Sequence, residues 1–301
     1  MAFRLSSDTN HVLGILLIAA STIFFALAGI FTKATSADPW TIACWRGLFG
    51  ALAIGIYVYV RRDRMAPRSS FALGWRGWAL ALVGGGSSVL FIVSFKYTYV
   101  ANVAVIYATV PFMAAGIEWL VLRQPARSQT VVTAVVCLLG VLVIVGGNLG
   151  GGHLFGDALA LVMTFGCSIY LIMVRAYRET PVVWAAAVGA FLLFVAGWVV
   201  TDPLAISARD FMIVAGFGLS FAAASILWTE GGRLLPASEA GLLGAAEVPL
   251  AILFGWLILT EAPPLQSVIG GAIVLCAVFA HAGRDVLRQR NGVAMVEESS
   301  R

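Results

Sequence analysis

Two ionisable residues lie deep within apolar stretches of the sequence, where their side chains could do chemistry. Arg46 lies in the stretch TIACWRGLFGALAIGIYV (41–58), and Glu247 lies nine residues past Ser238. If both stretches are helical, these positions are roughly 8 Å and 14 Å from the helix start at 1.5 Å per residue. Charged groups at such depth are costly unless they pair, change protonation or face water. Arg46, whose donor fork suits carboxylates, is therefore a candidate substrate anchor, and Glu247 is a candidate proton carrier.

The rest of the chain has the composition of an integral membrane protein. Hydrophobic residues make up 60% and charged residues 11% of it, and its mean hydropathy is +0.95, whereas soluble domains carry about 25% charged residues. Apolar runs of membrane-spanning length lie near 12–32, 41–60, 77–95, 102–122, 129–147, 156–174, 182–200, 211–231, 238–259 and 266–283. We therefore predict an all-α membrane protein with ten transmembrane helices and no soluble domain.

The basic residues indicate the orientation of these helices. With the N-terminus inside, fifteen of the 19 Lys and Arg residues fall on the cytoplasmic side, and only Lys33, Lys96 and Arg209 fall on the opposite side. The remaining basic residue, Arg46, lies within a span. Because basic residues collect in cytoplasmic loops, the distribution predicts that both termini are cytoplasmic.

The chain also repeats itself. GILLIAASTIFFALAGIFTK (14–33) resembles GDALALVMTFGCSIYLIMVR (156–175), and residues 101–125 resemble residues 237–263, with matched prolines at Pro111 and Pro249. Each proline removes a backbone donor and could act as a hinge or as a tolerated kink. We predict two halves, 1–149 and 150–301, with five helices each. Since five is odd, the second half would be inverted, an arrangement that recurs in transporters with substrate near the midplane.

These repeats and the Arg of ACWRGLFGALAI resemble the EamA family of the drug/metabolite transporter superfamily, over residues 12–283. The resemblance implies ten helices in two EamA repeats, location in a bacterial inner membrane, and movement of small organic metabolites, often as exporters. Members of the family often end the fourth and ninth helices with a Gly-Glu pair. Glu261 keeps the acid in the second half, whereas Gln124 replaces it in the first.

Structural roles compete with the chemical ones. Arg46 could extend its side chain to the membrane interface, or could pair with Glu247. Glu247 could instead hold two helices together through an ion pair. Glu118 could take part in proton coupling, pair with Arg123 or reach the interface. Four aromatic residues are candidates for lining a cavity, and each could equally pack elsewhere: Phe95, Tyr107, Tyr170 and Trp228.

Motifs of other functional classes are missing from the sequence. It has no GxxxxGK[ST] phosphate loop, no HExxH or GxSxG pattern within a span, no TVGYG filter, and no cysteine spacing typical of metal sites. We predict neither an enzyme nor a cofactor, metal or nucleic-acid partner. The expected partners are a small-molecule substrate and the lipid bilayer, and the energy could come from a proton gradient through Glu247 or from the substrate gradient alone; the oligomeric state stays open, a monomer included.

These observations predict a secondary transporter that works by alternating access. We expect an exporter of amino-acid-like or related compounds. A permease that takes up a nutrient or vitamin would use the same residues, and a channel or a scaffold is a further alternative.

Overall fold

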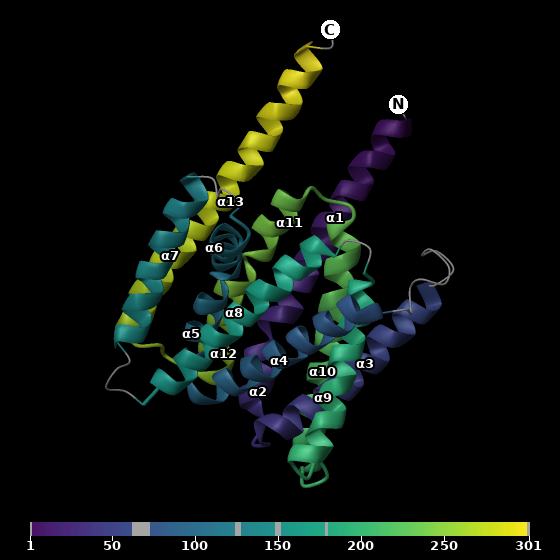
Figure 1. The fold of residues 1–301 in the computed structure, drawn as a ribbon, viewed down its shortest axis with the longest axis vertical. Helices are drawn as coiled ribbons and strands as arrows, with labels where there is room; N and C mark the ends of the chain where they lie inside the picture. Colours follow the sequence, from purple (N-terminus) through teal and green to yellow (C-terminus); the bar gives the residue numbers. More distant parts are fainter. Residues whose placement is uncertain (1, 62–72, 124–127, 148–151, 178–179, 300–301) are drawn as a thin grey trace.

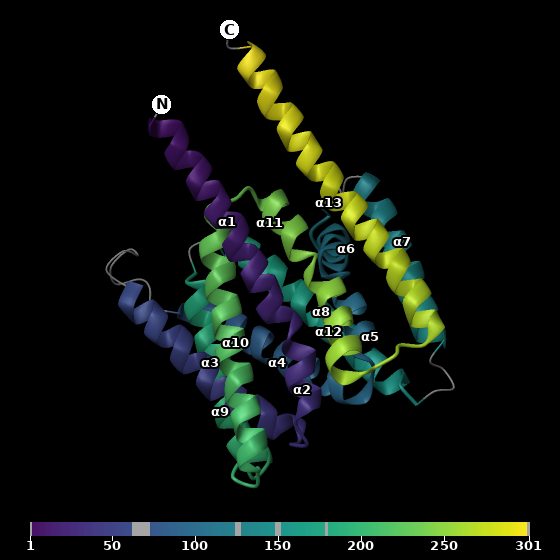
Figure 2. The same ribbon diagram turned by 180° about the vertical axis from the view of Figure 1, so that it is seen from behind.

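A computed structural model describes residues 2–61, 73–123, 128–147, 152–177 and 180–299, and all regular elements in these ranges are helices. In order they are α1 (Ala2–Ala26), α2 (Ala28–Ala34), α3 (Pro39–Arg61), α4 (Gly74–Tyr97), α5 (Val100–Tyr107), α6 (Val110–Leu122), α7 (Ser128–Gly147), α8 (Leu154–Ala176), α9 (Val182–Val200), α10 (Ala208–Gly232), α11 (Ala237–Gly244), α12 (Glu247–Leu259) and α13 (Leu265–Ser299). The first turns of α1 and the last turns of α13 project from the same end of the bundle (Figures 1 and 2).

Ten stretches of the described chain are long and apolar enough to cross a membrane, which confirms the predicted spans. Three of them join two helices each: α1 with α2, α5 with α6, and α11 with α12. Large apolar side chains remain on the outside of the bundle; Leu120 is 73% exposed and Val199 is 83% exposed. Because exposed apolar surface of this extent is rare on soluble monomers, it is the surface that lipid would cover.

Two of the predicted spans, 102–122 and 238–259, are each broken in the middle into two helices. The first breaks between α5 and α6 at Ala108 and Thr109, next to Pro111. The second breaks between α11 and α12, next to Pro249. Proline lacks the N–H that would bond to the carbonyl four residues earlier, so one helix ends and another starts at matched places in the two halves.

Both α6 and α12 end on a residue with left-handed backbone, Arg123 (φ 50°) and Thr260 (φ 53°). Non-glycine residues rarely adopt this conformation, which costs roughly 1–2 kcal/mol. Glycine adopts it freely, which explains physically why a Gly-Glu pair suits these helix ends. Gln124, which follows Arg123, lies outside the described residues.

Helices from the two halves of the chain pack against one another. In particular, α3 packs on α9 and α10, α4 packs on α8 and α9, α1 packs on α10, and α7 packs on α13. A Cβ atom on Gly47 of α3 would lie only 2.4 Å from the carbonyl oxygen of Ala190 in α9, so glycine is needed where these two backbones meet. Small residues at helix contacts are the usual means of close packing in membranes.

Substituting alanine for Gly47 should therefore destabilise the bundle. The added methyl group must push α3 away from α9, and overpacking of this kind costs about 1–3 kcal/mol. Gly86→Ala is the matched control, because a Cβ atom at Gly86 of α4 would meet nothing within 4 Å. Thermal unfolding of the detergent-purified variants should show a lower midpoint for Gly47→Ala alone; equal midpoints would contradict this account of the contact.

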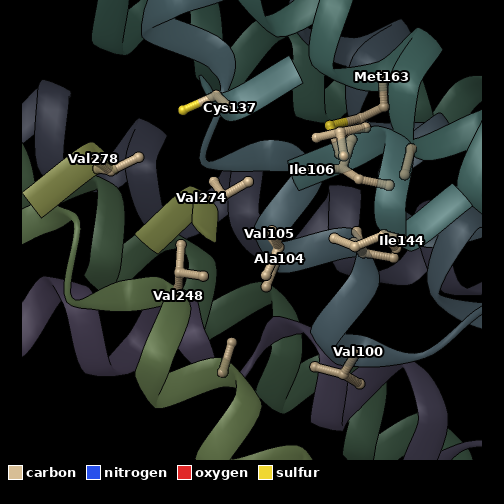
Figure 3. Close-up of a cluster of buried hydrophobic side chains, with 14 of the residues drawn as sticks. Val100, Ala104, Val105, Ile106, Cys137, Ile144, Met163, Val248, Val274 and Val278 are labelled. Carbon is tan, nitrogen blue, oxygen red and sulfur yellow. The ribbon is translucent and has the colours of Figure 1, made fainter. Parts of the chain in front are cut away.

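The largest apolar core lies where α5 meets α7, α8, α12 and α13. It includes Val105 and Ile106 of α5, Ile144 of α7, Met163 of α8 and Val274 of α13, all essentially inaccessible to solvent (Figure 3). Helix α5 comes from the first half of the chain, and α12 and α13 come from the second. This core therefore fixes the two broken spans relative to each other.

Candidate functional site

A cavity of about 1190 Å³ lies between the two halves of the chain. Arg46 of α3 and Ser88 of α4 line the cavity inside the bundle. The lining also includes Glu118, Arg175 and His281, which lie near the last turns of the α6, α8 and α13 spans. These last turns lie at the end of the bundle that carries both chain termini (Figures 1 and 2). The cavity therefore extends toward that end.

The opposite end of the bundle is held shut by a group that we call the clasp, formed by Lys33, Glu261 and the backbone N–H of Val100. Lys33 of α2 forms an ion pair with Glu261, just past α12. Glu261 also accepts a hydrogen bond of 3.0 Å from the Val100 N–H, at the start of α5. Both charged side chains are mostly buried, at 21% and 16% exposed. The clasp joins the first half of the chain to the second.

Further hydrogen bonds reinforce this closed end. Ser36 donates to Asp210 at 2.8 Å, and Thr98 and Asn102 donate to the buried Asp157 at 2.6 Å and 3.0 Å. Each of these bonds also runs between the two halves of the chain. None of the five residues is among those that line the cavity in the described part of the chain.

Asp38 fixes the start of α3, the helix that carries Arg46. Its carboxylate accepts hydrogen bonds from the side chain and backbone N–H of Thr41 and from the N–H of Trp40, which is 2.9 Å away. Burial raises the pKa of this carboxyl, but the hydrogen bonds to its charged form outweigh burial and hold the pKa below its usual value. The helix start therefore depends on an ionised Asp38.

Arg46 is buried, with 4% of its surface exposed, yet it contributes to the cavity wall. Its Nη1 donates to the Ser88 hydroxyl at 2.5 Å. The guanidinium carbon lies 4.8 Å from the ring centre of Phe217 and 4.2 Å from that of Phe221, both on α10. Its Nε has no hydrogen-bond partner. Among the described residues, Arg46 forms no ion pair with Glu247 or with any other acid.

Glu247 is the first residue of α12 and also lines the cavity. It lies at the helix break that precedes Pro249, and Tyr107 and Cys167 line the same cavity. The break thus brings a carboxyl group to the cavity wall beside two other ionisable groups.

Three of the four predicted aromatic residues line the cavity, namely Tyr107, Tyr170 and Trp228. Trp228 lies against Gly244, where an added Cβ atom would be 2.6 Å from the indole ring. Phe95 is not among the residues that line the cavity in the described part of the chain. Its ring is 2% exposed and packs edge-on against Phe91 in the apolar core, and Phe91 lies between it and the cavity that Phe91 lines.

Of the other predicted site residues, Glu118 and Pro111 line the cavity and Pro249 does not. Glu118 lines the cavity near its open end, where it pairs with Arg175 at 3.7 Å and not with Arg123. Pro111 lines the cavity and Pro249 does not, although each follows a helix break. Neither a role for Ser88 nor the pairing of Glu261 with Lys33 was predicted from the sequence.

Comparisons with known proteins agree with this architecture. The EamA-like transporter family matches the chain twice, over residues 12–146 and 154–281. No curated protein matches it. A solved structure titled "Crystal structure of protein" is 19% identical, covers 93% of this chain and 97% of its own, and superposes with a TM-score of 0.61. At that identity the similarity shows the fold alone.

Proposed function

The chain belongs to the EamA-like transporter family, whose members transport and are not enzymes, and from this premise we propose that it moves a small organic metabolite by alternating access. One observation carries the proposal: the cavity between the halves extends to one end of the bundle while the clasp holds the other end shut. Alternating access requires the reverse arrangement as its second state. The matched breaks at Pro111 and Pro249 would serve as the hinges.

The finer proposal is efflux of amino-acid-like or related compounds from a bacterial cell. The basic residues favour a cytoplasmic location for both termini, and with that orientation the cavity opens to the cytoplasm, where an exporter loads. Within the inverted halves 1–149 and 150–301, Arg46 would bind substrate and Glu247 would carry a proton. The alternative is uptake of a nutrient or vitamin by the same fold, and the experiment must distinguish uptake from efflux.

Flux through reconstituted protein tests the proposal. Medium from cells with and without the protein would first be compared, and the compounds that differ would then be supplied to proteoliposomes. A carrier gives saturable flux that is stimulated by unlabelled substrate on the opposite side, whereas a channel gives flux that does not saturate. Net efflux from right-side-out vesicles supports export, and net accumulation in them supports uptake. Unsaturable conductance, or no flux of any compound, would contradict the proposal.

A further inference from the structure

We infer that the substrate is a monocarboxylate with an apolar body, bound at the Nε edge of the Arg46 guanidinium while the Ser88 hydroxyl holds that group in place. The inference rests on the proposed transport function and deepens it. It assigns the charge and shape of the ligand, and it makes Ser88 a positioning residue that acts through Arg46.

The charge of the ligand follows from the surroundings of Arg46. The side chain is 4% exposed, and no acid pairs with it in the part of the chain that the structure describes. The contacts with Phe217 and Phe221 stabilise a cation but do not neutralise it. A buried charge without a partner is strongly unfavourable. Because Arg46 is part of the cavity wall, an anion in the cavity can supply that partner.

The shape of the ligand follows from the donors that are still available. Nη1 is already bonded to Ser88, whereas the buried Nε has no partner. The donors left for a ligand are therefore those on the edge that Nε shares with Nη2. Two parallel N–H groups on one edge of a planar guanidinium match the two oxygens of a carboxylate. A neutral amide offers only one acceptor there and leaves the charge without a counter-ion.

The rest of the cavity favours an apolar body and a single negative charge. Phe91, Tyr107, Tyr170 and Trp228 contribute to its wall. Glu247 lies on the same wall, and among the described residues the cation at the open end, Arg175, is already paired with Glu118. A second carboxylate on the ligand would therefore lie in the cavity without a free cation to pair with, which selects against dicarboxylates.

Ligand binding to the purified full-length protein tests the inference without relying on flux. The probes are 3-phenylpropionate, its neutral isostere 3-phenylpropanamide, and the dicarboxylate phenylsuccinate, followed by tryptophan fluorescence in detergent. We expect 3-phenylpropionate to bind about tenfold more tightly than either of the others, as a charge-assisted bidentate contact warrants. Equal binding of acid and amide, or no measurable binding of the acid, would overturn the inference.

Variants at Arg46 and Ser88 test whether these two residues cause the preference for the acid over the amide. Arg46→Lys keeps the charge but removes the planar fork, and it should lose most of the preference for acid over amide. Ser88→Ala should reduce that preference several-fold, because the guanidinium is no longer held. Ser94→Ala is the control, since the Ser94 hydroxyl bonds to the Phe91 carbonyl of its own helix and Ser94 is not among the residues that line the cavity. An unchanged acid-to-amide ratio in both Arg46→Lys and Ser88→Ala would refute the assignment.

The two proposals fail in different ways. If the acid binds as expected but no saturable flux occurs in proteoliposomes, the transport proposal is wrong and the binding site stands. If flux is saturable but neutral compounds and carboxylates bind equally well, the transport proposal stands and this inference is wrong. Should Arg46→Lys fail to yield folded protein, the ratio measured with Ser88→Ala decides the question, because that change removes one hydroxyl only.

Discussion

Glu247→Gln should abolish the use of a pH gradient while leaving exchange of substrate for substrate intact. A carboxyl group can take up and release a proton within the membrane, whereas an amide cannot. Accumulation driven by an imposed pH gradient should therefore fall roughly 5–150-fold, the range of a coupling free energy of 1–3 kcal/mol. Counterflow requires only binding and reorientation, so it should continue. Both quantities can be measured on one preparation of proteoliposomes.

The reason for this expectation is the place of Glu247 in the cavity. It starts α12 at a helix break, where a conformational change of the broken span would alter its contact with water. In the described part of the chain no base forms an ion pair with it. A carboxyl in an apolar wall is neutralised by a proton, and the same group in contact with water can release it. Proton uptake on one side and release on the other is what coupling requires.

Glu118→Gln is the matched control for this experiment. Glu118 belongs to α6, the counterpart of α12 in the first half, and it also lines the cavity. It lies at the open end and pairs with the half-exposed Arg175 at 3.7 Å, so its charge has a partner without a proton. We expect its replacement to change pH-driven accumulation by less than about twofold, as for a surface ion pair. If Glu118→Gln uncouples transport and Glu247→Gln does not, the proton pathway lies at the other acid.

The sequence predicted the spans well because their length and apolarity come directly from the bilayer. It also placed Arg46 and Glu247 within spans, and the structure finds both on one cavity wall. It did not predict that the proline-containing spans would break into separate helices, since neighbouring helices often satisfy the carbonyl that a proline leaves free. Apolarity along a span is a local property of the chain, whereas a break depends on what packs beside it.

The sequence could not predict the direction of a side chain either, because that direction also depends on which helices pack side by side. Helix α4 is apolar on most of its surface, so periodicity could not tell whether Phe95 faces the cavity, the core or lipid. The Lys33–Glu261 pair joins residues 228 positions apart, and no local pattern predicts such a contact. One signal was present: Lys33 is one of only three basic residues on the side that the charge distribution makes external. A cation in that position calls for a nearby acid.

Crosslinking Lys33→Cys to Glu261→Cys should stop transport and should do so reversibly. The clasp joins the halves at the closed end, so the second state of an alternating-access cycle requires these two positions to separate. A short bifunctional methanethiosulfonate reagent would hold them together in a background without the four native cysteines, Cys44, Cys137, Cys167 and Cys276. Flux in proteoliposomes should fall by about an order of magnitude or more, because the second state can no longer be populated. Reduction with dithiothreitol should restore it.

The controls distinguish a loss of flux caused by closure from a loss of flux caused by damage to the protein. Each single cysteine variant treated with the same reagent should keep its flux, because nothing then spans the halves. Replacing both charges also removes the ion pair and the bond to the Val100 N–H, which together hold the closed end by roughly 1.5–3 kcal/mol per charged hydrogen bond. The reduced double variant should therefore visit the opposite state more often, and cysteines placed beside the clasp should label faster in it. Full flux through the crosslinked protein would show that transport does not require this end to open between positions 33 and 261, which would contradict the assigned second state.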